Sequence, residues 1–392
     1  MAQKEKDFLT LVGVGDNKPQ RDDPPSAFGL CVNAFRNADI VFGQLESVYS
    51  DRGIPMFTPQ VLRRRSPKNI TAFNEKGAGF DVMSYACNHA MDYGWEAFYD
   101  TLDLFKKNNI TLVGAGRNIE EARKPAIIEK KGTKVGFLAY LTIVFPGLIA
   151  EPDVPGCAPL RAVTFYQQWD FQPGTPPLII TKLIPEEKAA MEEDIKKLRS
   201  KVDVLVVSIH CGVHLIPAVV AMYQKEAAYA AIDAGADLVL QHHAHILKGV
   251  EMYKGKAIFY GLGNFTGDRT PAVAGKPRGD SIYLNLTDHY SIATIPGWEK
   301  YPYHPDARNT VIAKAYIADK KIEKVTYIPT YINPNAEPEV VLHKDPKAQG
   351  CFDYVRRISE SEGLQATFSW DGDEVLLSPK EERSRFVGAP VV

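Results

Sequence analysis

Apolar runs that each end in a polar cluster constrain the fold of this chain more than any other feature. The most strand-like run, residues 202–209, is mostly apolar and ends at His210. Similar runs at residues 8–15, 39–43 and 80–86 also lead into polar residues. Continuous apolar runs of this length are typical of strands that are buried on both faces. We therefore expect buried strands whose carboxyl ends open into a site.

Helical patterns alternate with these strands, which predicts an α/β protein. Apolar residues recur with helical spacing near residues 28–35, 95–107, 186–199 and 223–234. Residues 131–133 join two strand-like runs as a hairpin, so the sheet is predicted to be mixed. We expect one catalytic domain over residues 8–330, with a C-terminal helix and strand extension over residues 331–392 packed on it.

A histidine-rich segment follows the apolar run 237–240 and predicts a metal site. Three of the chain's 9 histidines, His242, His243 and His245, fall within four positions. Residues two apart on an extended backbone point the same way, so His243 and His245 can present their imidazoles to one point. Neutral imidazole binds divalent transition metals well. The alternative is a polar turn whose histidines make local hydrogen bonds.

Further candidate ligands follow the other strands. The full set is Asp16, Glu46, Asn88, His210, His243 and His245. Such a set suits two divalent ions ~3.5–4 Å apart, between which a carboxylate can bridge and water can be activated. His89 is placed to act as a general acid or electrostatic stabiliser, and Asp92 to orient its ring. A single Asp or Asn at a strand end is more often a turn-former or helix cap. Here five successive strand ends carry such residues, the last one carrying two histidines, and this favours a site.

Candidate substrate contacts lie in the loops around these motifs, namely Lys18, His214, Asn264, Trp169 and Arg269. Trp169 belongs to a Pro-rich insertion over about residues 145–185, and a second insertion covers about residues 267–308. The first is expected to be either an aromatic lid over the substrate or a surface excursion. The basic run 63–65 is predicted to be a solvated loop, which leaves no cluster of arginines beside the motifs.

Composition excludes several classes of protein. With 392 residues and a formal net charge of -2, the chain lacks the basic face of a nucleic-acid binder. No apolar run approaches the ~20 residues of a membrane span, so we expect a cytoplasmic protein. Its 5 cysteines show no C-x-x-C spacing, which predicts reduced thiols. The expected partner is a small acidic substrate, and the sequence leaves open whether the chain forms a homo-oligomer.

The order of the motifs resembles a known family. Gly15-Asp16, Gln44-Leu45-Glu46, Asn88 to Gly94, Val207 to His210, His243-Ala244-His245 and Gly263-Asn264-Phe265 are similar to motifs of the poly-γ-glutamate capsule (CapA-like) family, a branch of the calcineurin-like metallophosphoesterases. The resemblance implies a four-layer αββα sandwich of two mixed sheets with a dinuclear metal centre. By motif, Glu46 would bridge the ions, Asp16 and His245 would bind the first, and Asn88, His210 and His243 the second.

One departure from the family pattern bears on function. The superfamily has Asp-x-His at the first motif, whereas Asp16 is followed here by Asn17 and Lys18. The first metal site is therefore predicted to be weak or empty, with one or two ions of Zn, Mn, Fe or Ni bound in all. We expect a metal-dependent hydrolase that cleaves an amide-type bond, γ-glutamyl-like or cyclic, by activating water. The alternatives are a phosphodiesterase or phosphatase, and a non-catalytic metal- or polyglutamate-binding protein.

Overall fold

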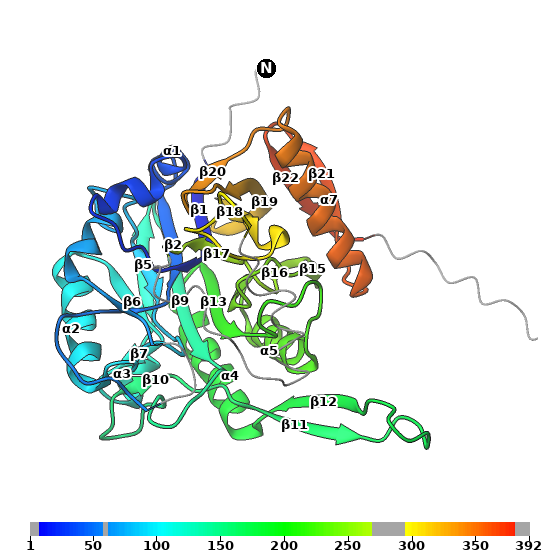
Figure 1. Ribbon diagram of the computed structural model, residues 1–392, viewed down its shortest axis with the longest axis horizontal. Helices are drawn as coiled ribbons and strands as arrows, with labels where there is room; N and C mark the ends of the chain where they lie inside the picture. Colours follow the sequence, from blue (N-terminus) through cyan, green and yellow to red (C-terminus); the bar gives the residue numbers. More distant parts are fainter. Residues whose placement is uncertain (1–7, 58–61, 269–294, 381–392) are drawn as a thin grey trace, which may run out of the picture.

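Two mixed β-sheets pack face to face in the computed structural model, which describes residues 8–57, 62–268 and 295–380 (Figure 1). The larger sheet has, in spatial order, β21 (Thr367–Asp371), β22 (Glu374–Ser378), β19 (Lys321–Ile332), β18 (Asn309–Ala318), β1 (Leu9–Asn17), β2 (Ile40–Leu45), β5 (Val82–Ser84) and β6 (Thr111–Val113), with β17 (Asn264–Thr266) beside β1 and β20 (Pro338–Val340) beside β19. Strands β1, β2, β5 and β6 run parallel. Their carboxyl ends therefore meet at one edge.

The smaller sheet has, in spatial order, β15 (Val250–Tyr253), β16 (Lys256–Phe259), β14 (Leu238–His243), β13 (Val204–Cys211), β9 (Thr133–Leu141) and β8 (Ala126–Lys130). The four central strands are parallel and the two outer strands antiparallel. The mixed sheet and the 131–133 hairpin are thus as predicted, and the α/β class is confirmed.

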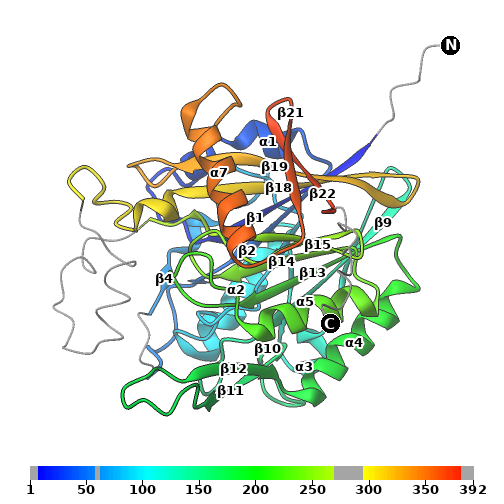
Figure 2. The ribbon, with the colours of Figure 1, turned by 90° about the vertical axis from the view of Figure 1, so that its right-hand side faces the viewer.

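Helices cover the outer faces of both sheets. Helix α2 (Gly94–Lys107) packs on the larger sheet, where Phe98 stacks on Tyr85 with ring centroids 5.6 Å apart. Helices α4 (Pro185–Arg199) and α5 (Met222–Ala234) share a second apolar core with the smaller sheet. Between the sheets, Phe42 stacks on Phe137 at 5.4 Å within the main core. Helix α7 (Pro346–Ser361) adds its buried face to this core over the C-terminal strands (Figure 2).

Short elements connect the layers. They are η1 (Pro24–Phe28), α1 (Val32–Arg36), β3 (Val48–Tyr49), β4 (Arg64–Arg65), η2 (Pro67–Ala72), β7 (Ala115–Gly116), α3 (Ile119–Ala122), β10 (Gly156–Cys157) and η4 (Pro305–Arg308). The prediction of a single helix near residues 28–35 is wrong. The paired prolines at 24 and 25 begin a 3₁₀ turn, and Gly29 separates it from the short α1. Phe28 and Phe35 nevertheless pack edge to face at 5.7 Å.

The first predicted insertion contains a two-stranded hairpin, β11 (Ala162–Gln167) and β12 (Leu178–Leu183), that extends from the body of the protein (Figure 1). Trp169 lies in the loop between these strands and is 72% exposed. Its aromatic neighbours Phe165, Tyr166 and Phe171 are exposed as well. In the second insertion, residues 269–294, and with them Arg269, lie outside the described residues.

The prediction of a solvated loop at residues 63–65 is wrong. Strand β4 pairs in parallel with β3, and Arg65 is buried. The guanidinium of Arg64 lies 3.8 Å from the centre of the Tyr93 ring. Planar guanidinium groups can be buried in this way because they stack on aromatic faces while they keep their hydrogen bonds.

All five cysteines are buried and unpaired with one another, as the sequence predicts for reduced thiols. Among the described helices, none combines the length and hydropathy needed to span a membrane.

Candidate metal centre

The carboxyl ends of parallel strands from both sheets converge on one cluster of buried polar residues. Strand β1 carries Asp16, and Glu46 directly follows β2. From the smaller sheet, β13 carries His210 and β14 ends at His243. Parallel strands deliver their C-terminal residues to a common edge, which is why residues distant in sequence meet here.

A glycine lets the first strand approach the turn before β17. A Cβ on Gly15 would lie 2.1 Å from the carbonyl oxygen of Gly263. The close approach allows the backbone N–H of Asp16 to donate to that oxygen at 3.0 Å. Asp16 is thereby held opposite Asn264 in the parallel pairing of β1 and β17.

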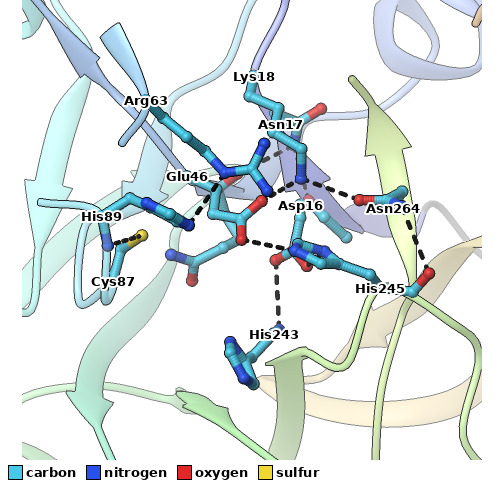
Figure 3. Close-up of polar contacts among 12 residues, drawn as sticks. Asp16, Asn17, Lys18, Glu46, Arg63, Cys87, His89, His243, His245 and Asn264 are labelled. Atoms are coloured by element: carbon cyan, nitrogen blue, oxygen red, sulfur yellow. Dashed lines mark hydrogen bonds and ion pairs between the residues drawn. The ribbon is translucent and has the colours of Figure 1, made fainter. Parts of the chain in front are cut away.

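Asp16, Glu46 and His245 form the first group of potential ligands, with ligand atoms within 4.8 Å of one another. Nδ1 of His245 lies 3.0 Å from Asp16 Oδ2, and Nε2 lies 2.9 Å from Glu46 Oε1 (Figure 3). Burial acts most strongly, to lower the pKa of His245, but the charge of Glu46 and the hydrogen bonds to Asp16 and Glu46 together outweigh it, so the pKa is raised. Burial acts to raise the pKa of Glu46, but His245 and Lys18 hold it well below its usual range.

Glu46, His210 and His243 form the second group, again with ligand atoms within 4.8 Å. Nε2 of His210 lies 2.8 Å from Asn88 Oδ1. Burial lowers the pKa of His210 well below its usual range and that of His243 to about 4, so both rings are neutral. The buried Nδ1 atoms of both have no hydrogen-bond partner among the described residues. Neutral imidazoles with unused nitrogens beside a carboxylate fit a divalent transition metal.

The backbone around His243 and His245 differs from the extended one that was predicted. Their φ angles are 78° and 55°, in the left-handed region. The strand has ended at His243, so the two rings do not share a strand face, and their centroids lie 6.1 Å apart. Each ring instead belongs to a different ligand group. Left-handed backbone at non-glycine residues is uncommon and gathers at functional sites.

His89 and Asp92 form a buried pair, and His89 directly follows Asn88, which contacts His210 of the second group. Nδ1 of His89 lies 2.7 Å from Asp92 Oδ2, and Nε2 of His89 accepts a hydrogen bond of 2.9 Å from Nε of Arg63. These partners assign the ring proton to Nδ1. Burial and the charge of Arg63 together hold the pKa of His89 well below its usual range. The ring is therefore neutral, with the lone pair on Nε2.

Sequence reasoning missed Arg63. Its backbone N–H donates to Asp92 Oδ2 at 2.5 Å, so both its backbone and its side chain contact the His89–Asp92 pair. Burial acts most strongly, to lower its pKa, but the charges of Glu46, Tyr303 and Asp92 together outweigh this effect and the pKa is raised. The only available signal was its place in a long loop between two ligand-bearing strands. The prediction excluded a cluster of arginines beside the motifs, and the structure places a single arginine, Arg63, there.

The structure brings three of the five predicted substrate contacts to this cluster. Lys18 and Asn264 contact each other at 3.0 Å between Nζ and Oδ1, and Lys18 Nζ also contacts Glu46. His214 is exposed, and its ring centroid lies 5.2 Å from that of His243 and 4.8 Å from that of His245. Trp169, on the exposed hairpin loop, is not part of the cluster.

Two other arginines that could bring positive charge to the motifs, Arg21 and Arg117, form ion pairs with residues outside the two ligand groups. Arg21 pairs with Asp268 and Glu337, and Arg117 pairs with Asp103.

Comparison with known proteins agrees with this arrangement of motifs. The family model described as bacterial capsule synthesis protein PGA_cap matches residues 7–269. The chain is 30% identical over 253 residues to the PGA biosynthesis protein CapA of Bacillus subtilis (strain 168), covering 62% of this chain and 57% of that protein. It is 32% identical over 204 residues to the capsule biosynthesis protein CapA of Bacillus anthracis, covering 52% of this chain and 44% of the relative.

The chain thus spans about half the length of these two relatives. Among solved structures, a hypothetical protein from Thermus thermophilus superposes with a TM-score of 0.43 at 12% identity, covering 82% of this chain and 98% of that chain. The PGA_cap match extends over well over half of the sequence and over every ligand-bearing strand end described above. The chain therefore belongs to the PGA_cap family of bacterial capsule synthesis proteins.

Proposed function

We propose that this protein is a metal-dependent hydrolase that cleaves an amide-type bond, γ-glutamyl-like or cyclic, in a small acidic substrate. One observation carries the proposal. Two neutral, buried imidazoles with unused nitrogens, His210 and His243, lie beside Glu46, and the His89–Asp92 pair begins one residue after Asn88, which contacts His210. Ligand atoms for a cation and a group that can accept a proton thus occur in one site.

The residues that would hold the ion are Glu46, Asn88, His210 and His243. A bound divalent ion would lower the pKa of water and polarise the scissile carbonyl. Zn, Mn, Fe and Ni all accept this combination of oxygen and imidazole donors.

His89 would move the proton. Its Nε2 carries the lone pair and can accept a proton from the attacking water, then return it to the leaving nitrogen. Asp92 keeps the other ring proton on Nδ1 and stabilises the imidazolium that forms between the two transfers. A site that merely holds structure needs no such pair, which argues against a non-catalytic metal- or polymer-binding protein.

Arg63 and Lys18 would orient the substrate by its charge. A guanidinium binds a carboxylate through two parallel hydrogen bonds. In this structure the guanidinium of Arg63 donates to Nε2 of His89. An acidic substrate that accepted this hydrogen bond in place of His89 would leave Nε2 free for proton transfer. Substrate binding and activation of His89 would then be coupled.

A phosphodiesterase or phosphatase is the second candidate, and Arg63 favours it. Phosphoryl transfer needs positive charge around the equatorial oxygens, and Arg63 and Lys18 supply more of it than the sequence indicated. We still favour the amide, because amide hydrolysis needs one activated water and a polarised carbonyl, whereas phosphoesterases of this kind normally use two ions.

The test is a matched substrate panel. Aryl phosphate mono- and diesters are compared with γ-glutamyl, cyclic and simple amides, each with Zn, Mn, Fe and Ni added to metal-free protein. Activity that the His89→Asn variant lacks belongs to this site and not to a contaminant. We expect the highest kcat/KM with an acidic amide. Phosphoesters turned over well above every amide would establish the second candidate instead.

A further inference from the structure

A buried lysine occupies the part of the cluster where the family resemblance implies the first metal ion. Lys18 follows β1 directly and is 1% exposed. Its Nζ contacts a carboxylate oxygen of Glu46 and donates to Asn264 Oδ1 at 3.0 Å (Figure 3). The ammonium group therefore lies at the carboxylate that would bridge two ions.

The surroundings hold Lys18 in this place. Its backbone N–H donates to the carbonyl of Thr266 at 2.9 Å, which ties the residue to β17. Asn264, on the same strand, is itself fixed, because its Nδ2 donates to Oη of the buried Tyr301 at 3.1 Å. A lysine side chain loses much conformational entropy when it is ordered, so several fixed partners indicate a defined position.

The ligand atoms around Lys18 already have partners. Both ring nitrogens of His245 face a carboxylate oxygen, one from Asp16 and one from Glu46. The second oxygen of Glu46 contacts Lys18. A metal ion in this group would have to displace these contacts and lie next to an ammonium group. Two like charges so close in a buried site repel each other strongly.

In the second ligand group, by contrast, two ring nitrogens have no partner within the described part of the chain. Nδ1 of His210 and Nδ1 of His243 are buried and have no hydrogen-bond partner among the described residues. Buried polar atoms without a partner are costly, and a bound cation would remove that cost. The first ligand group thus needs no ion to satisfy its atoms, whereas the second group has buried nitrogens that an ion would satisfy.

We propose that the ammonium group of Lys18 takes the place of the first metal ion, so that the protein binds a single divalent ion at Glu46, Asn88, His210 and His243. The lysine supplies a fixed positive charge on the other side of the Glu46 carboxylate. This inference rests on the metal site of the proposed function but not on the reaction.

The experiment counts bound ions. Metal-free protein is titrated with Mn²⁺, and bound ions are measured by elemental analysis after desalting and by electron paramagnetic resonance, which distinguishes isolated from coupled Mn²⁺. The wild type should bind one isolated ion per chain. Lys18→Met removes the charge at similar length, and Lys18→His adds an imidazole. Both should take up a second equivalent, with the signal of a coupled pair.

Two controls separate the role of charge from that of folding. Lys18→Arg keeps a cation and should still bind one ion. Lys248→Met removes another buried lysine, one whose Nζ contacts the carbonyl of Ile216, and should also bind one. Two ions in the wild type, or one ion in both folded Lys18→Met and Lys18→His, would overturn the inference. If neither variant folds, the wild-type stoichiometry and Lys18→Arg still decide it. A protein that binds one ion but hydrolyses no substrate would refute the proposed function alone.

Discussion

Replacing Lys248 by Met should stabilise the protein, and more at pH 7 than at pH 9. Lys248 is 1% exposed, and its Nζ contacts the carbonyl of Ile216 in the loop that carries His214. Burial lowers its pKa from 10.5 to about 7. The folded protein therefore releases this proton near pH 7, whereas the unfolded chain keeps it to about pH 10.5. Between these values the unfolded state binds more protons, so the wild type becomes more stable as the pH rises.

The magnitude follows from that pKa. At about 1.4 kcal/mol for each pH unit, the buried lysine costs the folded state about 4 kcal/mol at pH 7 and about 2 kcal/mol at pH 9. Removing it also deletes the hydrogen bond to Ile216, at about 1 kcal/mol at either pH. Lys248→Met should then raise the free energy of unfolding by about 3 kcal/mol at pH 7 and by about 1 kcal/mol at pH 9.

Urea denaturation followed by fluorescence at both pH values measures this difference. Groups that titrate in both proteins cancel in the comparison, because distant sites contribute additively. Lys344→Met, at an exposed position, controls for the substitution itself and should show no pH-dependent difference from the wild type. An equal stabilisation by Lys248→Met at both pH values, or a less stable variant at pH 7, would refute the reasoning.

Three further predictions concern the candidate site. His243→Ala should lose the bound ion, because its imidazole is one of four assigned ligands; full metal content by elemental analysis would contradict the assignment. His89→Asn should keep the ion but lower kcat by ~10²–10⁴-fold, as for a lost acid–base group, and wild-type turnover would make His89 a structural residue. Trp169→Ala should raise KM with little change in melting temperature if the hairpin loop covers the substrate, whereas an unchanged KM with a lower melting temperature would assign Trp169 to packing.

The strands and the longer helices could be predicted because their signals are local. An apolar run such as residues 202–209, rich in valine, is typical of an interior strand that is buried on both faces, and β13 forms there. Helices α2, α4 and α5 begin and end within a residue or so of their predicted bounds. The region near Phe28 differs from the prediction of one helix, because a 3₁₀ turn that starts at two prolines ends at Phe28 and α1 begins only at Val32.

The positions of the candidate ligands were also accessible from the sequence. Parallel strands of an α/β protein must place their carboxyl ends along one edge, so polar residues after successive strands were expected to meet. The two groups around Glu46 contain Asp16, His210, His243 and His245, and Asn88 contacts His210 at 2.8 Å. Their roles in binding and catalysis remain predictions.

The amino-acid order alone therefore specifies the buried strands and the polar residues at their ends, since both depend on neighbours along the chain. Which of those residues are already paired depends on how the chain folds in space. Lys18 meets Asn264 from 246 positions away, and Arg63 reaches His89 across 26. Neither contact leaves a local pattern, because an ion pair or hydrogen bond depends on distance and burial in space and not on spacing in the chain.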